Sequence, residues 1–225
     1  MKIQVYLAGD QRKTKQLQSK IQTIADQVVK ILEANLVFEY NLDLVVTNRM
    51  PYEIPPEEDF GIVYTTRTNA IAQFAQSKVN SENIQFELLT DIAFKYRNSH
   101  IKLDKLPYTF ARALFDYGLA WFFAQQYLDN PANLSKMKQL VLARTSQEHT
   151  AIFKRCRRYF FKKQYDHWSF FYESNTSKSQ KFIGESLGLF LVTRYLKDTD
   201  QSITQALQNP YQKFENWLRD FTPVV

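Results

Sequence analysis

The densest group of charged side chains in this sequence lies between residues 154 and 163. Its candidate binding residues are the cations Lys154, Arg155, Arg157, Arg158 and Lys162. On a helical wheel these five fall on one arc. The opposite arc carries the apolar side chains of Ile152, Cys156, Tyr159 and Phe160. Such a face can bind the phosphates of a nucleic acid or an acidic membrane surface. A solvated face whose long side-chain stems cover apolar neighbours is the structural alternative.

Aromatic residues follow this basic run at positions 165, 168, 170, 171 and 172. Their rings could stack on bases, as they do in proteins that bind single strands. The alternation of Trp168, Phe170 and Tyr172 is also typical of a half-buried extended segment that packs the C-terminal helices. We therefore predict an extended segment here, with packing as its main role.

Histidine and cysteine give no sign of a metal or a nucleophile. His100, His149 and His167 each lack a second His or Cys at the spacing of metal ligands. Cys156 lies among apolar neighbours, which indicates core packing. Because it is the only cysteine, an internal disulfide is excluded. We find no Gly-rich phosphate loop and no nucleophile elbow, and we expect no cofactor.

Composition predicts a folded, water-soluble chain. The 225 residues are 44% hydrophobic and 23% charged, which fits one large domain or two small ones with a sizeable core. The longest apolar run, residues 118–124, is far shorter than the ~20 residues that span a bilayer. Residues 1–10 have too short an apolar run for a signal peptide. We expect a cytoplasmic protein whose net charge of +6 permits acidic partners.

The N-terminal part predicts a small sheet with one long helix. Residues 2–8 alternate weakly and predict an edge strand, and apolar residues recur at helical spacing over 13–34. Alternation around residues 42–46 predicts a second strand, and 61–65 and 70–75 predict two more. Residues 50–58 hold three prolines, so we expect a loop.

From Ser81 onward the sequence is dominated by helices. Ser81 is the expected N-cap of the first, and Pro107 the expected first turn of a helix that runs to about Leu128. That helix is apolar nearly all round, so it belongs at a buried centre. Further helices are predicted near 133–145, 147–164, 180–197, 202–208 and 211–220. The fold class is α+β, as a single domain over 1–225 with parts 1–100 and 101–225.

This order of elements resembles bacterial zinc-dependent proteases of the gluzincin, zincin-like type. In that family a short helix carries HExxH, and the buried helix carries Glu-Gly-Leu-Ala, whose Glu is the third metal ligand. Here residues 117–120 read Tyr-Gly-Leu-Ala. Residues 183–188 and 191–196 are similar to the family's late Gly-rich helix, where Glu185 could face a cleft. The similarity would cover about residues 15–220.

The resemblance implies a site that has lost its metal ligands. The favoured alignment places HExxH on residues 91–95, so Asp91 and Lys95 stand at the two histidines and Ile92 at the general base. A shift to residues 90–94 turns both ligand positions away from the apolar stripe of the helix. An ammonium has no lone pair to donate, an isoleucine cannot move a proton, and Tyr117 is a poor zinc ligand at neutral pH. Asp91 and Lys95 form an i, i+4 charge pair or a plain surface pair.

We therefore expect a non-catalytic, metallopeptidase-like protein that binds a peptide or protein partner in a remnant cleft. The cleft candidates are Asp91, Ile92, Lys95, Tyr117 and Glu185. One alternative is a nucleic-acid-binding protein that uses the basic helix 154–163. Another is an enzyme of unknown, metal-independent reaction built on Asp91, Lys95 or Tyr117.

Overall fold

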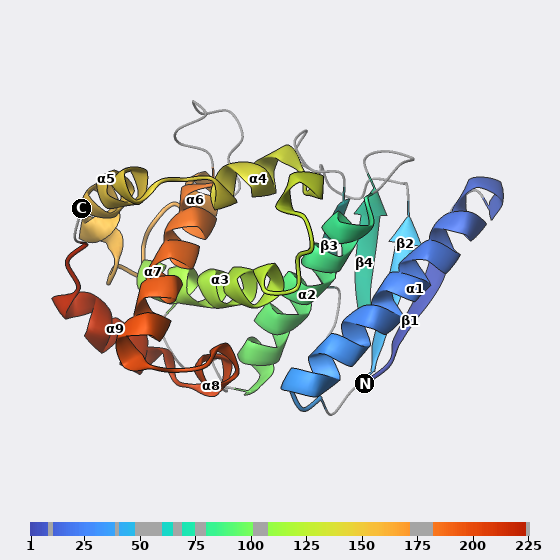
Figure 1. Cartoon of the computed structure of the whole chain (residues 1–225), viewed down its shortest axis with the longest axis horizontal. Coiled ribbons are helices and arrows are strands. Elements are labelled where there is room, and N and C mark those ends of the chain that lie inside the picture. The colour runs from blue at the N-terminus through green and yellow to red at the C-terminus, as the bar shows by residue number, and fades with distance from the viewer. Residues whose placement is uncertain are drawn as a thin grey trace. The chain divides into compact units, whose positions relative to one another are not determined.

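The computed structural model describes residues 1–8, 11–38, 41–47, 60–64, 69–74, 80–100, 108–171 and 182–223. It confirms the predicted α+β class, with a small N-terminal sheet and mostly helices after it (Figure 1). The chain divides into two compact units. The first comprises Met1–Asp91 and Tyr127–Met137, and the second comprises Ile92–Gln126 and Lys138–Val225. The predicted loop at 50–58 lies outside the described residues.

Four strands among the described residues form one mixed sheet in the first unit. They are β1 (Ile3–Ala8), β2 (Leu42–Thr47), β3 (Phe60–Tyr64) and β4 (Asn69–Phe74). The order across the sheet is β1-β2-β4-β3, with β3 antiparallel to β4 and the other pairs parallel. Residues 42, 44 and 46 are buried, as their alternation predicts. The predicted edge position of β1 is confirmed.

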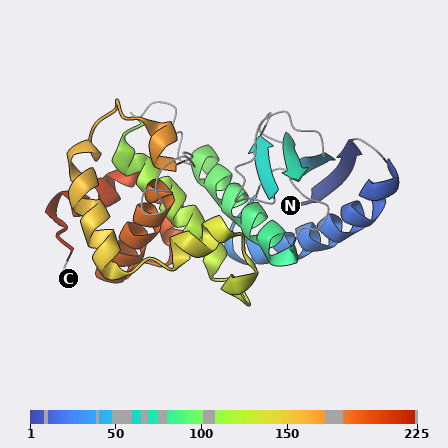
Figure 2. The same cartoon turned by 90° about the horizontal axis from the view of Figure 1, so that it is seen from above.

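Helix α1 (Gln11–Asn35) lies beside β1 (Figure 2). Two of its glutamines form hydrogen bonds with backbone groups at the unpaired edge of that strand. The Gln22 side chain accepts a hydrogen bond from the Val5 amide at 3.0 Å and donates to the Ile3 carbonyl at 2.9 Å. Gln18 donates to the Val5 carbonyl at 2.9 Å. An exposed strand edge invites pairing with another chain, and these two side chains occupy that edge instead.

The N-cap of helix α2 (Ser81–His100) is one residue earlier in the sequence than predicted. The Asn80 side chain accepts from the Glu82 amide at 2.9 Å, so Asn80 rather than Ser81 caps the helix. The apolar stripe of α2 is buried as predicted, at Ile84, Leu88, Leu89, Ile92, Ala93 and Tyr96. The first unit contains α2 up to Asp91, and the second contains the helix from Ile92.

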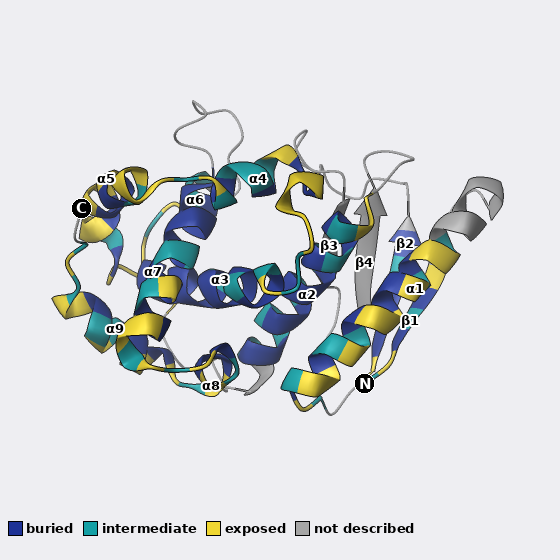
Figure 3. Ribbon diagram, in the orientation of Figure 1, coloured by how far each residue is buried: buried dark blue, intermediate teal, exposed yellow. Residues whose placement is uncertain are grey.

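The remaining helices follow in sequence. They are α3 (Phe110–Gln125), η2 (Pro131–Asn133), α4 (Lys136–Leu142), α5 (Ser146–Cys156), η3 (Arg157–Tyr159), α6 (His167–Phe171), α7 (Ile183–Thr199), α8 (Ile203–Gln208) and α9 (Tyr211–Asp220). Helix α3 is buried nearly all round, as predicted (Figure 3). Its cap is Thr109, whose hydroxyl accepts from the Arg112 amide at 3.2 Å. Pro107, predicted to lie in the first turn, is outside the described residues, and the described helix begins at Phe110.

Two glycines set the packing of α3 against α7. A Cβ on Gly118 would lie 2.2 Å from the Gly188 carbonyl oxygen, and a Cβ on Gly188 would lie 2.5 Å from the Leu114 carbonyl oxygen. The two backbones are therefore too close for any side chain at either position. The Gly of the Gly-Leu-Ala element thus has a packing role. No described helix is both long and apolar enough to cross a membrane.

Candidate functional site

The three candidates on α2 differ in their exposure. Ile92, at the position of a general base, is 1% exposed and belongs to the core. Asp91 and Lys95 are half-buried and lie one turn apart on the same face of the helix. An aliphatic side chain in the core has no proton to transfer, so α2 supplies no catalytic base at that position.

Tyr117 lies in a stack of aromatic rings. Its ring centroid is 4.9 Å from that of Phe94 and 4.5 Å from that of Phe171. His167 stacks on Phe171 at 4.6 Å and lies 6.0 Å from Tyr117. These separations are those of favourable ring packing. The place that a third metal ligand would take is thus filled by hydrocarbon contacts.

The contact between Phe94 and Tyr117 bears on the alignment of the motif. Phe94 is the last position of the shifted alignment over 90–94, and it is the position that this contact places against Tyr117. A phenyl ring donates no electron pair to a metal, and neither does a lysine ammonium. Under either alignment the residues do not fit zinc, which takes nitrogen, thiolate or carboxylate ligands. Among the described residues, no group of three or more His, Cys, Asp or Glu could hold a metal ion.

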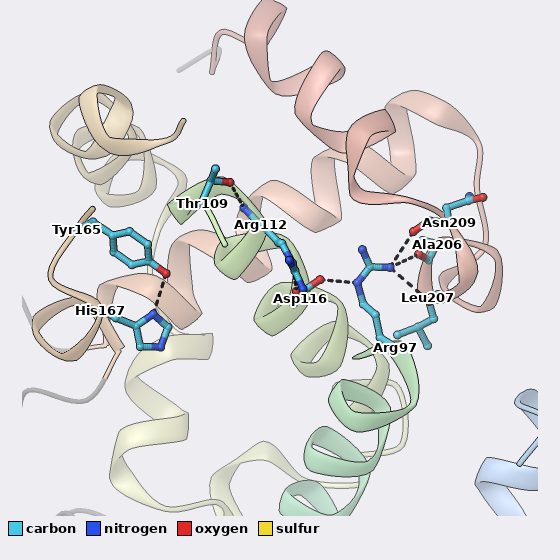
Figure 4. Close-up of polar contacts among 9 residues, drawn as sticks. All are labelled: Arg97, Thr109, Arg112, Asp116, Tyr165, His167, Ala206, Leu207 and Asn209. Carbon is cyan, nitrogen blue, oxygen red and sulfur yellow. Dashed lines mark hydrogen bonds and ion pairs between the residues drawn. The ribbon is translucent and has the colours of Figure 1, made fainter. Parts of the chain in front are cut away.

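A buried ion pair between α2 and α3 is the main polar feature that the sequence does not predict (Figure 4). Arg97 and Asp116 are both fully buried, and Arg97 Nε donates to Asp116 Oδ1 at 2.5 Å. Arg112 Nε lies 3.5 Å from Asp116 Oδ2, one turn away on the same helix. The sequence feature that could have predicted this pair is the i, i+4 spacing of Arg112 and Asp116 in a helix that is otherwise apolar.

Arg97 also holds the end of α8. Its Nη1 donates to the carbonyls of Ala206 at 3.1 Å, Leu207 at 3.3 Å and Asn209 at 2.9 Å. The last carbonyls of a helix have no partner within the helix and carry partial negative charge. A single guanidinium therefore joins α2, α3 and α8, which indicates a structural role for this group.

His167 and His149 have separate hydrogen-bond partners. His167 Nδ1 is 2.8 Å from the Tyr165 hydroxyl, and burial lowers the pKa of this imidazole (Figure 4). His149 Nε2 is 2.9 Å from the Ser186 hydroxyl. Burial, with the nearby Arg144 cation, lowers the pKa of His149 to about 4. His149 is therefore neutral at physiological pH.

Glu185 and Cys156 are both core residues. Glu185 is 5% exposed in the first turn of α7, and its charge acts on Arg144. Cys156 is fully buried, and burial raises the pKa of its thiol to about 11. A thiol with so high a pKa is a poor nucleophile, which agrees with its predicted packing role.

All five cations of the basic run are exposed. We call Lys154, Arg155, Arg157, Arg158 and Lys162 the basic face. They do not share one helix, so the prediction of a helix over 147–164 is wrong. Helix α5 ends at Cys156, η3 covers 157–159, and Lys162 lies in the turn that follows.

Tertiary hydrogen bonds explain why the helix ends early. The carbonyls of Phe160 and Lys162 accept from the amides of Ala111 at 2.8 Å and Phe110 at 3.2 Å. The first amides of a helix need such partners, and here the turn after η3 supplies them to α3. The turn is thereby fixed to the most buried helix of the unit. The extended segment predicted around 168–172 is also wrong, because residues 167–171 form α6.

Aromatic rings lie among these cations. Arg158 Cζ is 4.8 Å and Lys162 Nζ is 5.5 Å from the centroid of the Tyr159 ring. Arg219 of α9 places its Cζ 4.1 Å from the centroid of Phe161. Both distances to Arg carbons are typical of cation–π contacts. The basic face therefore combines positive charge with ordered rings.

The chain matches no protein-family model, no curated protein and no solved structure. The resemblance to zincin-like proteases thus depends on the sequence pattern alone.

Proposed function

We propose that the protein binds nucleic acid through the basic face. The observation that carries this proposal is that its five cations are all exposed. None of the five forms an ion pair with a residue that the structure describes. Cations without acidic partners bind phosphates at no cost of broken ion pairs, and they release counterions from the nucleic acid.

Helix α5, which carries the first two cations of the basic face, is poorly suited to a membrane surface. Peripheral helices bind lipid by burying an apolar side in the bilayer interface. In α5 that side is formed by Ile152, Phe153 and Cys156, which are buried within the protein. What remains available is charge, so a phosphate backbone is the better ligand.

Salt dependence tests this proposal. A fluorescent single strand of about 15 nucleotides is titrated with protein at about 50 and about 200 mM salt. If each cation meets one phosphate, the affinity falls roughly 100-fold between the two, from a slope of about −0.7 per contact. Replacing Arg157→Glu and Arg158→Glu together is expected to weaken binding roughly 10-fold or more, while circular dichroism shows the fold retained. Affinity that does not change with salt would contradict the proposal.

A second function is supported by the ring stack. Phe94, Tyr117, Tyr165 and His167 are each half-buried, so they offer partly exposed aromatic surface. We propose that a non-catalytic, metallopeptidase-like unit holds a peptide or protein partner at this surface. Aromatic side chains are common anchors in such interfaces.

Two measurements test this second function. Purified protein is expected to contain no stoichiometric zinc by elemental analysis and to leave casein uncut. Stoichiometric zinc or metal-dependent cleavage would contradict the proposal. Selection from a displayed random peptide library should enrich binders of the native protein that no longer bind after Tyr117→Ala. A library without enrichment would count against a peptide partner.

A further inference from the structure

We infer that the basic face takes single-stranded rather than duplex nucleic acid, with an unpaired base stacked on Phe161 and Arg219. This inference rests on the nucleic-acid-binding function proposed above and specifies the ligand of that same face. It assigns a role to two residues that lie outside the basic face itself.

The geometry supplies a stacking platform beside the cations. Phe161 lies in the turn after η3 and is 38% exposed, which is unusual for a phenylalanine. The Arg219 guanidinium carbon lies 4.1 Å from its ring centroid, and the Arg219 side chain is 53% exposed. Glu215 fixes that guanidinium through an ion pair at 2.6 Å. A planar group held over a ring presents its outer face to solvent.

Unpaired bases stack on both aromatic rings and guanidinium planes. The bases of a duplex are already stacked on one another, so they offer no free face to such a platform except at the ends. Lys162 is the next residue in the chain, and its cation is exposed. A strand that stacks a base on the platform therefore has phosphate-binding cations beside it.

This platform is a poor lipid anchor. A phenylalanine that inserts into a bilayer does so as an apolar group, without a charge on its ring. Here a guanidinium lies over the Phe161 ring, and insertion would carry that charge into the membrane. The pairing of ring and cation thus favours a base over an acyl chain.

Three probes with equal numbers of phosphates test the inference: a single-stranded oligothymidine, a duplex, and an abasic strand. The native protein is expected to bind oligothymidine best. Phe161→Ala is expected to lower that affinity roughly 5- to 100-fold, the usual range for one lost stacking contact. The same change should leave the abasic affinity and the salt slope unchanged, because no phosphate contact is lost. Phe161→Trp should restore binding, and Tyr6→Ala, another exposed ring, is the matched control.

The outcomes separate the inference from the function on which it rests. If the native protein bound all three probes equally and Phe161→Ala did not change these affinities, the stacking platform would be overturned and the basic face would remain the binding site. No binding of any probe at low salt would overturn both. Binding to anionic phospholipid vesicles but to no oligonucleotide would also overturn both.

Discussion

The single guanidinium of Arg97 contributes to both charge pairing and helix packing. It pairs with Asp116, donates to three carbonyls at the end of α8 and lies with its Cζ 4.5 Å from the Phe115 ring centroid. A buried charge is tolerated only when it is paired and hydrogen-bonded. The position of α8 therefore depends on one side chain of α2.

Removing Asp116 tests this dependence. Asp116→Ala leaves the buried guanidinium of Arg97 without its counter-charge, and the free energy of unfolding should fall by about 3–5 kcal/mol. Glu215→Ala is the matched control, because it removes the carboxylate of the surface ion pair with Arg219 and should cost about 0.5 kcal/mol or less. Urea denaturation measures both values. A loss at Asp116 no larger than at Glu215 would contradict the structural role.

His149 predicts a loss of stability on acidification. Its pKa in the folded state is about 4, against an ordinary value of 6.5. As pH falls below about 6.5, His149 binds a proton in the unfolded chain but stays neutral in the folded protein. The free energy of unfolding therefore decreases. The loss ends near pH 4, where both states are protonated. Allowing for partial solvent exposure, it amounts to roughly 1–2 kcal/mol.

Comparison with a variant isolates this histidine from the carboxylates that titrate in the same range. His149→Gln places an amide, which can donate or accept a hydrogen bond, near the Ser186 hydroxyl in the place of Nε2. Its free energy of unfolding should change less between pH 7 and pH 4.5 than that of the native protein. Identical pH profiles for the two proteins would show that His149 contributes nothing.

The crossing of α3 and α7 is decided by helix backbones. In an open helix, Gly→Ala stabilises by about 1 kcal/mol through helix propensity. At Gly118 the new Cβ would lie 2.2 Å from a backbone oxygen of Gly188. We expect Gly118→Ala to destabilise by about 1–3 kcal/mol, as overpacked cores do. The sign of the change in thermal midpoint therefore distinguishes a close crossing from an open helix.

Elements with a periodic apolar pattern were predictable from the sequence. The spacing of Ile21, Val28 and Leu32 predicts α1, and alternation around Leu44 predicts β2, because these patterns depend on neighbours in the chain. The end of α5 was not predictable in this way. It depends on the amides of α3, which are distant in sequence and take up the carbonyls of Phe160 and Lys162.

In the candidate sites, too, features that depend on neighbours in the chain were predictable, and contacts between residues distant in sequence were not. Exposure of Lys154 and Arg155 follows from the helical wheel of α5, since Ile152 and Cys156 are buried. The stacking of Arg219 over Phe161 and the contact of Phe94 with Tyr117 join residues that are far apart in the sequence. No local pattern encodes such contacts, so the sequence alone does not predict them.

At the scale of the whole molecule, net charge is a rival explanation for any binding to nucleic acid. The chain carries a net charge of +6 and has a sequence pI near 9.2. A diffuse positive charge attracts polyanions without any particular site. The proposed function instead requires that the cations act together at the basic face.

Two double variants of equal charge separate these explanations. Arg157→Glu with Arg158→Glu lowers the net charge by four, from +6 to +2. Lys30→Glu with Lys136→Glu does the same at exposed positions of the first unit. We expect the first pair to weaken oligonucleotide binding by roughly 10-fold or more at ~100 mM salt, because two phosphate contacts become repulsive. The second pair should change affinity by less than about 2-fold, since neither lysine belongs to the basic face and a screened charge without a phosphate contact acts weakly. Equal losses in fluorescence anisotropy titrations would assign the binding to overall charge.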